Sequence, residues 1–224
     1  MSRSGADGRP TVGQRLLYRL VRGAVVCFCR AFWRLSVTGR EHVPDGPFIL
    51  APVHRSNIDT PVVAAVTRRR LRYMGKDSLW KFRWSAWFFR NMGGFPVHRG
   101  TPDREALRWA SSVVAGGEPV VMFPEGTRQE GPIVEHVLDG VAFVALREGV
   151  PILPVGIGGS DRAMARGARL PRPVRVTMVI GPPIPATAPG AGERVPRRAV
   201  RELTVRLRDE LQLLYDEAQA RAGR

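Results

Sequence analysis

The sequence predicts an α/β domain in which helices cover a mixed β-sheet, preceded by an N-terminal amphipathic helix. Short apolar runs with strand character alternate with segments of helical periodicity along most of the chain, which is the pattern of layered α/β folds. The 224 residues are enough for one domain with a substantial buried core. A hydrophobic fraction of 44% and a charged fraction of 25% exclude a disordered, collagen-like or multi-span membrane protein.

The first 35 residues predict a leader followed by an amphipathic helix. Residues 1–10 are polar and are expected to be disordered, whereas residues 11–35 carry a helical pattern. At about 100° per residue, the arginines of this helix fall within an arc of roughly 120°, beside a broad apolar face. Such a helix is typical of the headgroup region of an anionic membrane, although a core-packed helix with solvent-facing arginines gives the same pattern. The stripe holds Arg15, Arg19, Arg22, Arg30 and Arg34, and the apolar face holds Leu16, Leu17, Leu20, Phe28, Phe32 and Trp33.

The longest charge-free run of this helix, residues 23–29, is far shorter than the ~20 apolar residues that span a bilayer. The sequence therefore predicts a helix that lies on the membrane and does not cross it.

The next elements follow in order from local signals. A Pro-Asp-Gly-Pro turn introduces a buried strand over residues 48–53. A short helix is predicted over 61–66, with Thr60 as its N-cap and Pro61 at the first helical position. Alternation in residues 174–180 indicates an exposed or edge strand. The remaining predictions are strands over 71–74, 119–123 and 152–158, helices over 102–115 and 137–148, and a last helix with Val200, Leu203, Leu207, Leu211 and Leu214 at helical spacing.

Residues 80–89 form an aromatic-rich segment of helical character. Its rings share one helical face, and cations flank that face. Packing in the core and contact with a membrane interface explain this stripe equally well, because interfacial regions favour aromatic rings beside cations. The rings are Trp80, Trp84, Trp87 and Phe88, and the cations are Lys81, Arg83 and Arg90.

The chain carries 35 Lys and Arg against 20 Asp and Glu, a formal net charge of +15, and 33 of the cations are arginines. Such a surface attracts nucleic acid, anionic lipid or a phosphorylated small molecule. We expect no nucleic-acid partner, because the aromatic residues cluster in one helix and do not interleave with basic residues on strands. Cys27 and Cys29 have no second pair, so neither a disulfide framework nor a zinc site is predicted.

His54 is a candidate catalytic residue. It directly follows the predicted strand over 48–53 and precedes a helix, where α/β folds expose ligand-binding groups. Asp59 lies five residues further on, and across a strand-to-helix turn its carboxylate can return to an imidazole nitrogen. There it would fix the tautomer and support the imidazolium formed on proton uptake. No serine or cysteine is obviously paired with this dyad, so His54 is predicted to activate a substrate hydroxyl; a structural histidine is the alternative.

Two further strand ends carry arginines. The segment Gly-Gly-Phe-Pro-Val-His-Arg-Gly predicts a short strand that leads to Arg99, and Phe-Pro-Glu-Gly-Thr-Arg presents Glu125, Thr127 and Arg128 from a turn. Two arginines at sheet edges can bind a phosphate bidentately. The alternatives are a solvated Arg99 and an internal salt bridge for Arg128. The sequence lacks a P-loop, a His-Glu-x-x-His motif, a Gly-x-Ser-x-Gly motif and a dinucleotide fingerprint.

Four ordered blocks together resemble the glycerophospholipid acyltransferase family. They are His-x4-Asp at 54–59, Gly-Phe-Pro-Val-His-Arg at 94–99, Phe-Pro-Glu-Gly-Thr-Arg at 123–128 and Val-Pro-Ile-Leu-Pro-Val at 150–155. The first block alone is weakly specific and the third is strongly specific, and the blocks follow the order and spacing of the family. The resemblance implies the family fold and an O-acyltransferase of phospholipid biosynthesis.

The resemblance also implies roles for residues. His54 would be the general base on the free hydroxyl of lysophosphatidic acid, oriented by Asp59, and the hydroxyl would attack an acyl thioester to give phosphatidic acid. The donor would be acyl-CoA or acyl-carrier protein, with no metal and no cofactor. Backbone amides near Gly126 are one candidate for stabilising the oxyanion. Arg99 would bind the acceptor phosphate, Glu125, Gly126, Thr127 and Arg128 would complete the acceptor site, and Pro154 would shape the pocket floor or acyl-binding wall.

Departures from the family pattern concern the acceptor. Gln129 stands where the family usually has serine, and the stretch before Gly140 is acidic where relatives often carry basic residues. An acyltransferase of the same mechanism with another lipid or glycolipid acceptor is therefore the alternative, and a non-catalytic anion-binding protein is a remote one. We expect a peripheral protein on the cytoplasmic face of the cell membrane, with a leader and surface helix over 1–34 and an acyltransferase domain over 35–224.

Overall fold

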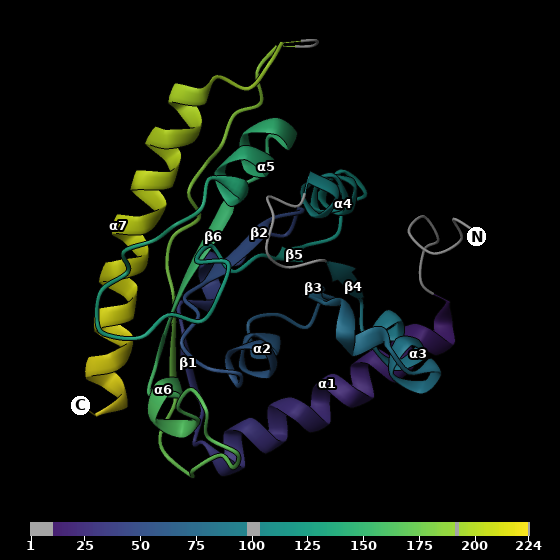
Figure 1. Ribbon diagram of the computed structural model, residues 1–224, viewed down its shortest axis with the longest axis vertical. Helices are drawn as coiled ribbons and strands as arrows, with labels where there is room; N and C mark the ends of the chain where they lie inside the picture. The colour runs from purple at the N-terminus through teal and green to yellow at the C-terminus, as the bar shows by residue number, and fades with distance from the viewer. Residues whose placement is uncertain (1–10, 98–103, 191–192, 224) are drawn as a thin grey trace.

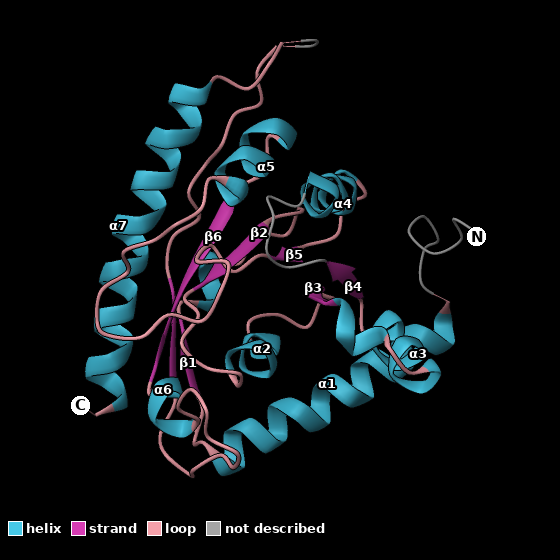
Figure 2. Ribbon diagram, in the orientation of Figure 1, coloured by secondary structure: helices cyan, strands magenta, loops and turns pink. Residues whose placement is uncertain are grey.

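A computed structural model describes residues 11–97, 104–190 and 193–223, so the predicted leader and Arg99 lie outside the described residues. Within these ranges, seven strands form one mixed sheet in the order β1-β7-β6-β2-β5-β3-β4 (Figures 1 and 2). All neighbouring strands are parallel except β6 and β7, which are antiparallel, and the predicted mixed α/β fold is confirmed. The strands are β1 Ser36–Thr38, β2 Ile49–Pro52, β3 Arg72–Lys76, β4 Gly94–Val97, β5 Val120–Val121, β6 Ile152–Gly158 and β7 Thr177–Ile180.

The described helices form two groups. In the first, α5 contacts both α4 and α7, and α7 packs along β6 and β7. In the second, α1 contacts α2 and α3 at the end of the molecule opposite α5 (Figure 1). The α-helices are α1 Val12–Phe32, α2 Asp59–Val62, α3 Arg83–Asn91, α4 Arg104–Ala115, α5 Gly140–Glu148, α6 Ser160–Ala163 and α7 Arg197–Ala222, and the 3-10 helices are η1 Arg40–His42, η2 Val63–Ala65 and η3 Asp77–Trp80.

The core lies around the central strands β2 and β6, in which every residue is buried. Two glycines of β6 allow α7 to approach the sheet closely, because a Cβ atom on Gly156 or Gly158 would overlap the backbone of α7. The five predicted apolar residues of α7 are all buried, and all but Leu214, which packs in a small cluster with Val179 and Ala218, belong to this core: Val200, Leu203, Leu207, Leu211 and Leu214.

The strand predicted over 174–180 is present as β7, but its predicted exposed or edge character is wrong. All four residues of β7 are buried, because β7 lies between β6 and the unpredicted three-residue strand β1. The predicted helix start after 48–53 is also wrong. The helix begins at Asp59 with Ile58 at the N-cap, and the carboxylate of Asp59 accepts the N–H groups of Arg55 and Ser56 in the preceding turn.

Helix α1 forms as predicted and begins with a capping box, in which the side chains of Thr11 and Gln14 each accept the other's backbone N–H. One side of α1 packs on the domain through Tyr18, Val26 and Cys29. Arg22 departs from the predicted stripe, since it is half-buried and its Nε donates to the carbonyl of Thr67 over 2.8 Å. The other predicted stripe residues are exposed: Arg15, Arg19, Arg30 and Arg34.

A second apolar side of α1 remains exposed, with exposed fractions of 57% for Leu16, 64% for Leu20 and 50% for Phe28. Helix α3 lies beside α1 (Figure 1), and its Trp84 and Trp87 are 71% and 60% exposed. Core packing is therefore excluded for these two tryptophans. Trp80 belongs to η3 instead of the shared helical face, and its ring contacts Phe89. No helix among the described residues combines the length and the hydropathy of a transmembrane span.

Candidate active site

His54 lies just beyond the carboxyl end of β2, beside the parallel strand β5, whose carboxyl end leads into Phe123 and the Phe-Pro-Glu-Gly-Thr-Arg turn. Because parallel strands end at the same edge, the two motifs meet there. The imidazole stacks on the ring of Phe123 at a centroid distance of 4.0 Å and is 7% exposed. The ring is thus held by packing while a small part of it remains accessible.

The predicted contact between His54 and Asp59 is present. Nδ1 of His54 lies 3.0 Å from Oδ2 of Asp59, which is completely buried. Since a carboxylate only accepts hydrogen bonds, Nδ1 is the donor, and in a neutral imidazole the lone pair is then on Nε2. The same Oδ2 atom accepts the backbone N–H groups of Arg55 and Ser56, each over 2.7 Å. One carboxylate thus closes the strand-to-helix turn and fixes the imidazole tautomer.

Glu125 connects the two motifs directly. It is 4% exposed, its Oε2 accepts the backbone N–H of His54 over 2.7 Å, and its Oε1 pairs with the guanidinium of Arg55. Burial raises the pKa of Glu125 above its ordinary value, while Arg55 and the His54 N–H act in the opposite direction. Both carboxylate oxygens are engaged by the chain itself, so they hold His54 and Arg55 in place and neither is left unpaired for a substrate.

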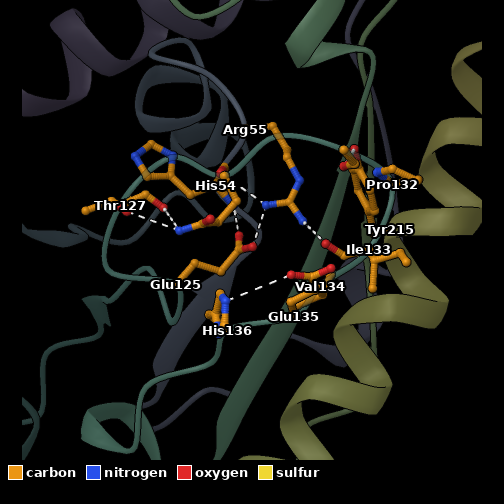
Figure 3. Close-up of polar contacts among 12 residues, drawn as sticks. His54, Arg55, Glu125, Thr127, Pro132, Ile133, Val134, Glu135, His136 and Tyr215 are labelled. Atoms are coloured by element: carbon orange, nitrogen blue, oxygen red, sulfur yellow. Dashed lines mark hydrogen bonds and ion pairs between the residues drawn. The ribbon is translucent and has the colours of Figure 1, made fainter.

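Arg55 is a site residue that the sequence analysis missed. It is 3% exposed, donates to the carbonyl of Ile133 over 3.1 Å, and its guanidinium carbon lies 4.9 Å from the ring centroid of Tyr215 on α7. Figure 3 shows the guanidinium and the imidazole of His54 extending in opposite directions. The signal available in the sequence was an arginine placed directly after the candidate base.

The turn after Glu125 places its residues at the surface. Gly126 adopts a left-handed backbone with φ of 69°, and Thr127 is exposed. The backbone N–H groups of Gly126 and Thr127 donate to carbonyls within the turn, over 3.0 and 2.7 Å, so these two candidate oxyanion donors are already engaged. Arg128 is half-buried and forms no ion pair with another described residue, so the internal salt bridge considered for it is not found.

The remaining expected site residues are less directly connected to His54. Pro154 is buried in β6, in register with Ala51 of β2, and its carbonyl accepts the N–H of Gly181 over 3.0 Å. It therefore lies within the sheet that supports the site. Gln129, where the family usually has serine, donates its backbone N–H to the carbonyl of His54 over 2.9 Å. Arg99 lies outside the described residues.

The known proteins that resemble this chain in sequence or structure are named as acyltransferases. A protein of Streptococcus pneumoniae named 1-acyl-sn-glycerol-3-phosphate acyltransferase is 28% identical over 167 residues, which cover 71% of this chain and 61% of that protein. Lyso-ornithine lipid O-acyltransferase of Pseudomonas aeruginosa is 26% identical over 155 residues, 68% of this chain and 57% of that protein. The crystal structure of the 1-acyl-sn-glycerophosphate acyltransferase PlsC from Thermotoga maritima matches with a TM-score of 0.61 and 26% identity, over 89% of this chain and 88% of that one.

The matched region spans less than two thirds of several relatives, including 53% of a Chlamydomonas reinhardtii protein with the same acyltransferase name. The sequence model of the Acyltransferase family matches residues 34–158, which is more than half of the chain. This range contains His54, Asp59 and the Phe-Pro-Glu-Gly-Thr-Arg turn. The chain therefore belongs to the Acyltransferase family.

Proposed function

We propose that this protein transfers a fatty acyl group from an acyl thioester to the free hydroxyl of lysophosphatidic acid, giving phosphatidic acid. The observation that carries the proposal is the dyad: Asp59 accepts from Nδ1 of His54, which leaves Nε2 as a proton acceptor at the accessible edge of the sheet.

In the proposed step, Nε2 of His54 takes the proton of the acceptor hydroxyl, and the hydroxyl oxygen attacks the thioester carbonyl. A C–O bond forms, the C–S bond breaks, and the proton on Nε2 passes to the leaving thiolate. The imidazolium that exists between these transfers is stabilised by the buried carboxylate of Asp59. No group on the protein becomes acylated, and His54 ends in its starting protonation state.

Arg128 is the proposed phosphate ligand among the described residues of the acceptor site. Its half-buried guanidinium has no partner among them, and the neighbouring Gly126 and Thr127 leave the turn surface open. An arginine in this state is available for bidentate binding of a phosphate. Arg99 is proposed as a second ligand from the family pattern alone.

Two observations support a second class of acceptor, lysolipids without a phosphate. One relative is named for a lyso-ornithine lipid, which carries no phosphate, and Gln129 departs from the serine usual in the family. A neutral or amine-bearing lysolipid is therefore the competing acceptor.

The deciding experiment incubates the purified protein and one acyl-CoA or acyl-carrier protein with a panel of lysolipids, with products identified by mass spectrometry. Acylation of lysophosphatidic acid above the other acceptors is expected, and Arg128→Gln should raise KM for that acceptor while changing KM for a phosphate-free lysolipid little. Preference for lyso-ornithine lipid would replace the acceptor assignment. Absence of transfer with every donor and acceptor would overturn the proposed function.

We also propose that the exposed apolar residues of α1 and α3 form one membrane-facing surface and that the domain works at the bilayer. This surface comprises Leu16, Leu20 and Phe28 of α1, with Trp84 and Trp87 of α3 and Phe82 at its N-cap. Exposed arginines flank it, which suits an anionic headgroup layer. The proposal lets the acceptor reach the protein from the bilayer and the product return to it, and it gives residues 1–34 the role of a membrane-binding appendage.

Co-sedimentation with vesicles tests this surface. Replacing Trp84 and Trp87 by serine is expected to weaken binding to vesicles rich in anionic lipid at least tenfold. Leu213→Ser is the matched control, because Leu213 is 66% exposed but lies on α7, away from α1 and α3. Equal binding by the tryptophan variant and the wild type would contradict the proposal.

A further inference from the structure

Helices α4, α5 and α7 line an open groove that does not include His54 or Asp59. Two adjoining cavities of about 500 and 310 Å³ share Leu107 of α4 and Phe143 of α5 in their lining. Val195 and Val200 extend the apolar floor toward the start of α7. Each volume falls within or near the range of small-molecule pockets, ~300–1,000 Å³.

The rim of the groove is strongly basic. Five of its eleven described lining residues are arginines, contributed by three helices, and all five are exposed. The only carboxylate among these lining residues is Asp139, which accepts a hydrogen bond from the hydroxyl of Thr204 over 2.8 Å. Arg147 also pairs with the adjacent Glu148 at 3.3 Å. The rim arginines are Arg104 and Arg108 of α4, Arg147 of α5, and Arg197 and Arg201 of α7.

The groove begins close to the candidate acceptor site. The backbone N–H of Leu138 donates to the carbonyl of Pro124 over 2.8 Å, and a Cβ on Gly126 would lie 2.7 Å from the side chain of Leu138. Helix α5 starts two residues after Leu138. At a rise of ~1.5 Å per residue, Arg147 lies only about 10 Å further along the helix than Gly140. A flexible arm can therefore connect a head group in the groove with a reacting carbonyl near His54.

We propose that this groove binds the 3′-phospho-ADP head of an acyl-CoA donor. The assignment rests on the proposed acyl transfer, and it deepens that function by choosing between the two thioester donors. Phe143 and the other apolar residues of the floor suit the adenine base, and the arginines suit the diphosphate and the 3′-phosphate. The elements that line the groove, α4, α5 and the start of α7, lie at the end of the molecule opposite α1 (Figure 1), so the charged head stays in water while the membrane-facing surface contacts lipid.

A concave, apolar floor favours the nucleotide over an acyl-carrier protein. A folded carrier domain binds over a broad surface of ~800 Å² on each partner, and it does not need a concave pocket. A nucleotide uses both features of the groove, the apolar floor and the arginine rim.

Calorimetric titration of unacylated CoA into the full-length protein tests the groove without requiring catalysis. Arg108→Glu and Arg201→Glu are each expected to weaken CoA binding about tenfold or more, since each replaces a donor of charge-assisted hydrogen bonds by a like charge facing the phosphates. Arg206→Glu is the matched control, because Arg206 lies on the same helix as Arg201, is also exposed and does not line the groove. It should bind CoA within twofold of the wild type. Dephospho-CoA should bind the wild type less tightly than CoA.

In the transfer assay, Arg201→Glu should raise KM for acyl-CoA and leave KM for the lysolipid unchanged. CoA binding by both groove variants at wild-type affinity would overturn the assignment. So would a wild type that fails to bind CoA but accepts acyl-carrier protein as its donor, and that result would leave the acyl-transfer function intact. Conversely, CoA binding that depends on Arg108 and Arg201 without acyl transfer to any lysolipid would support the groove and contradict the proposed function.

Discussion

The guanidinium of Arg55 and the carboxylate of Glu125 form an ion pair that is almost completely shielded from water. These residues are 70 positions apart in the chain and belong to the two motifs that carry the candidate site. The pair is completed on one side by the ring of Tyr215 and on the other by the backbone N–H of His54. The position of His54 therefore depends on the buried ion pair to which its backbone N–H is bonded.

Removing one partner of this pair should be more damaging than removing both. Glu125→Gln leaves Arg55 without its counter-charge, and loss of one partner of a buried ion pair costs about 3–5 kcal/mol. Urea unfolding of Glu125→Gln and Arg55→Met should show losses of this size, and the double variant Arg55→Met with Glu125→Gln should recover part of the loss. Single variants within about 0.5 kcal/mol of the wild type would show that the pair contributes no such stabilisation.

The same variants distinguish positioning from acceptor binding. Because both oxygens of Glu125 are engaged by Arg55 and His54, Glu125→Gln is expected to lower kcat more than it changes KM for the acceptor. A steady-state measurement with a folded variant gives this ratio. A large rise in KM with kcat unchanged would contradict this expectation and show that Glu125 contacts the substrate directly.

Asp59 has two functions that substitutions can separate. Asp59→Asn keeps an oxygen that can accept from Arg55 and Ser56, but it no longer enforces the reactive tautomer of His54. We expect a nearly wild-type free energy of unfolding and a kcat lower by about three to four orders of magnitude. Asp59→Ala should lose the turn as well, at a cost of about 1–3 kcal/mol. A kcat of Asp59→Asn within tenfold of the wild type would reduce Asp59 to a structural role.

His54→Ala tests the base itself. It should abolish acyl transfer while leaving far-UV circular dichroism and vesicle binding unchanged. His42→Ala is the control, because His42 contacts the carbonyl of Ile180 outside the site and should retain kcat. Full activity in His54→Ala would contradict the mechanism.

The distance along the chain between contacting residues explains which features can be predicted from the sequence. The contact of His54 with Asp59 spans five residues, so the strand and helix signals around these residues are enough to predict it. Strand β6 was predicted with its observed bounds because its apolar run is continuous. The three residues of β1 have no comparable pattern and become a strand only because β7 offers a pairing edge. The contact of Arg55 with Tyr215 likewise joins distant segments, and no local periodicity predicts it.

Gly156 is expected to be indispensable to the packing of α7. A Cβ atom there would overlap the backbone of Leu214, and a backbone cannot move aside as a flexible side chain can. Gly156→Ala should therefore lower the free energy of unfolding by roughly 3 kcal/mol. Gly23→Ala is the opposite control, since Gly23 lies inside α1 with open space around it, and alanine there should stabilise by about 0.5–1 kcal/mol. Equal effects of the two substitutions in urea unfolding would contradict this packing.

The two cysteines of α1 provide a direct test of how this helix is used. Cys27 is exposed, whereas Cys29 is completely buried, and burial raises the pKa of the Cys29 thiol to about 11. A raised thiol pKa keeps the group protonated, so at pH 8 only about one Cys29 in a thousand would be thiolate even if a reagent reached it. A water-soluble thiol reagent should modify Cys27 rapidly and Cys29 only after denaturation.

Anionic vesicles should then protect Cys27. Cys27 lies on the same exposed side of α1 as Leu20, about two turns further along the helix, so membrane binding through that side places its thiol among lipids. The rate of modification of Cys27 should fall at least tenfold with vesicles rich in anionic lipid and little with neutral ones, because the flanking arginines need anionic headgroups. Unchanged modification of Cys27 would show that α1 does not bind lipid through this side. Rapid modification of Cys29 in the vesicle-bound protein would instead show that α1 leaves the domain when it binds.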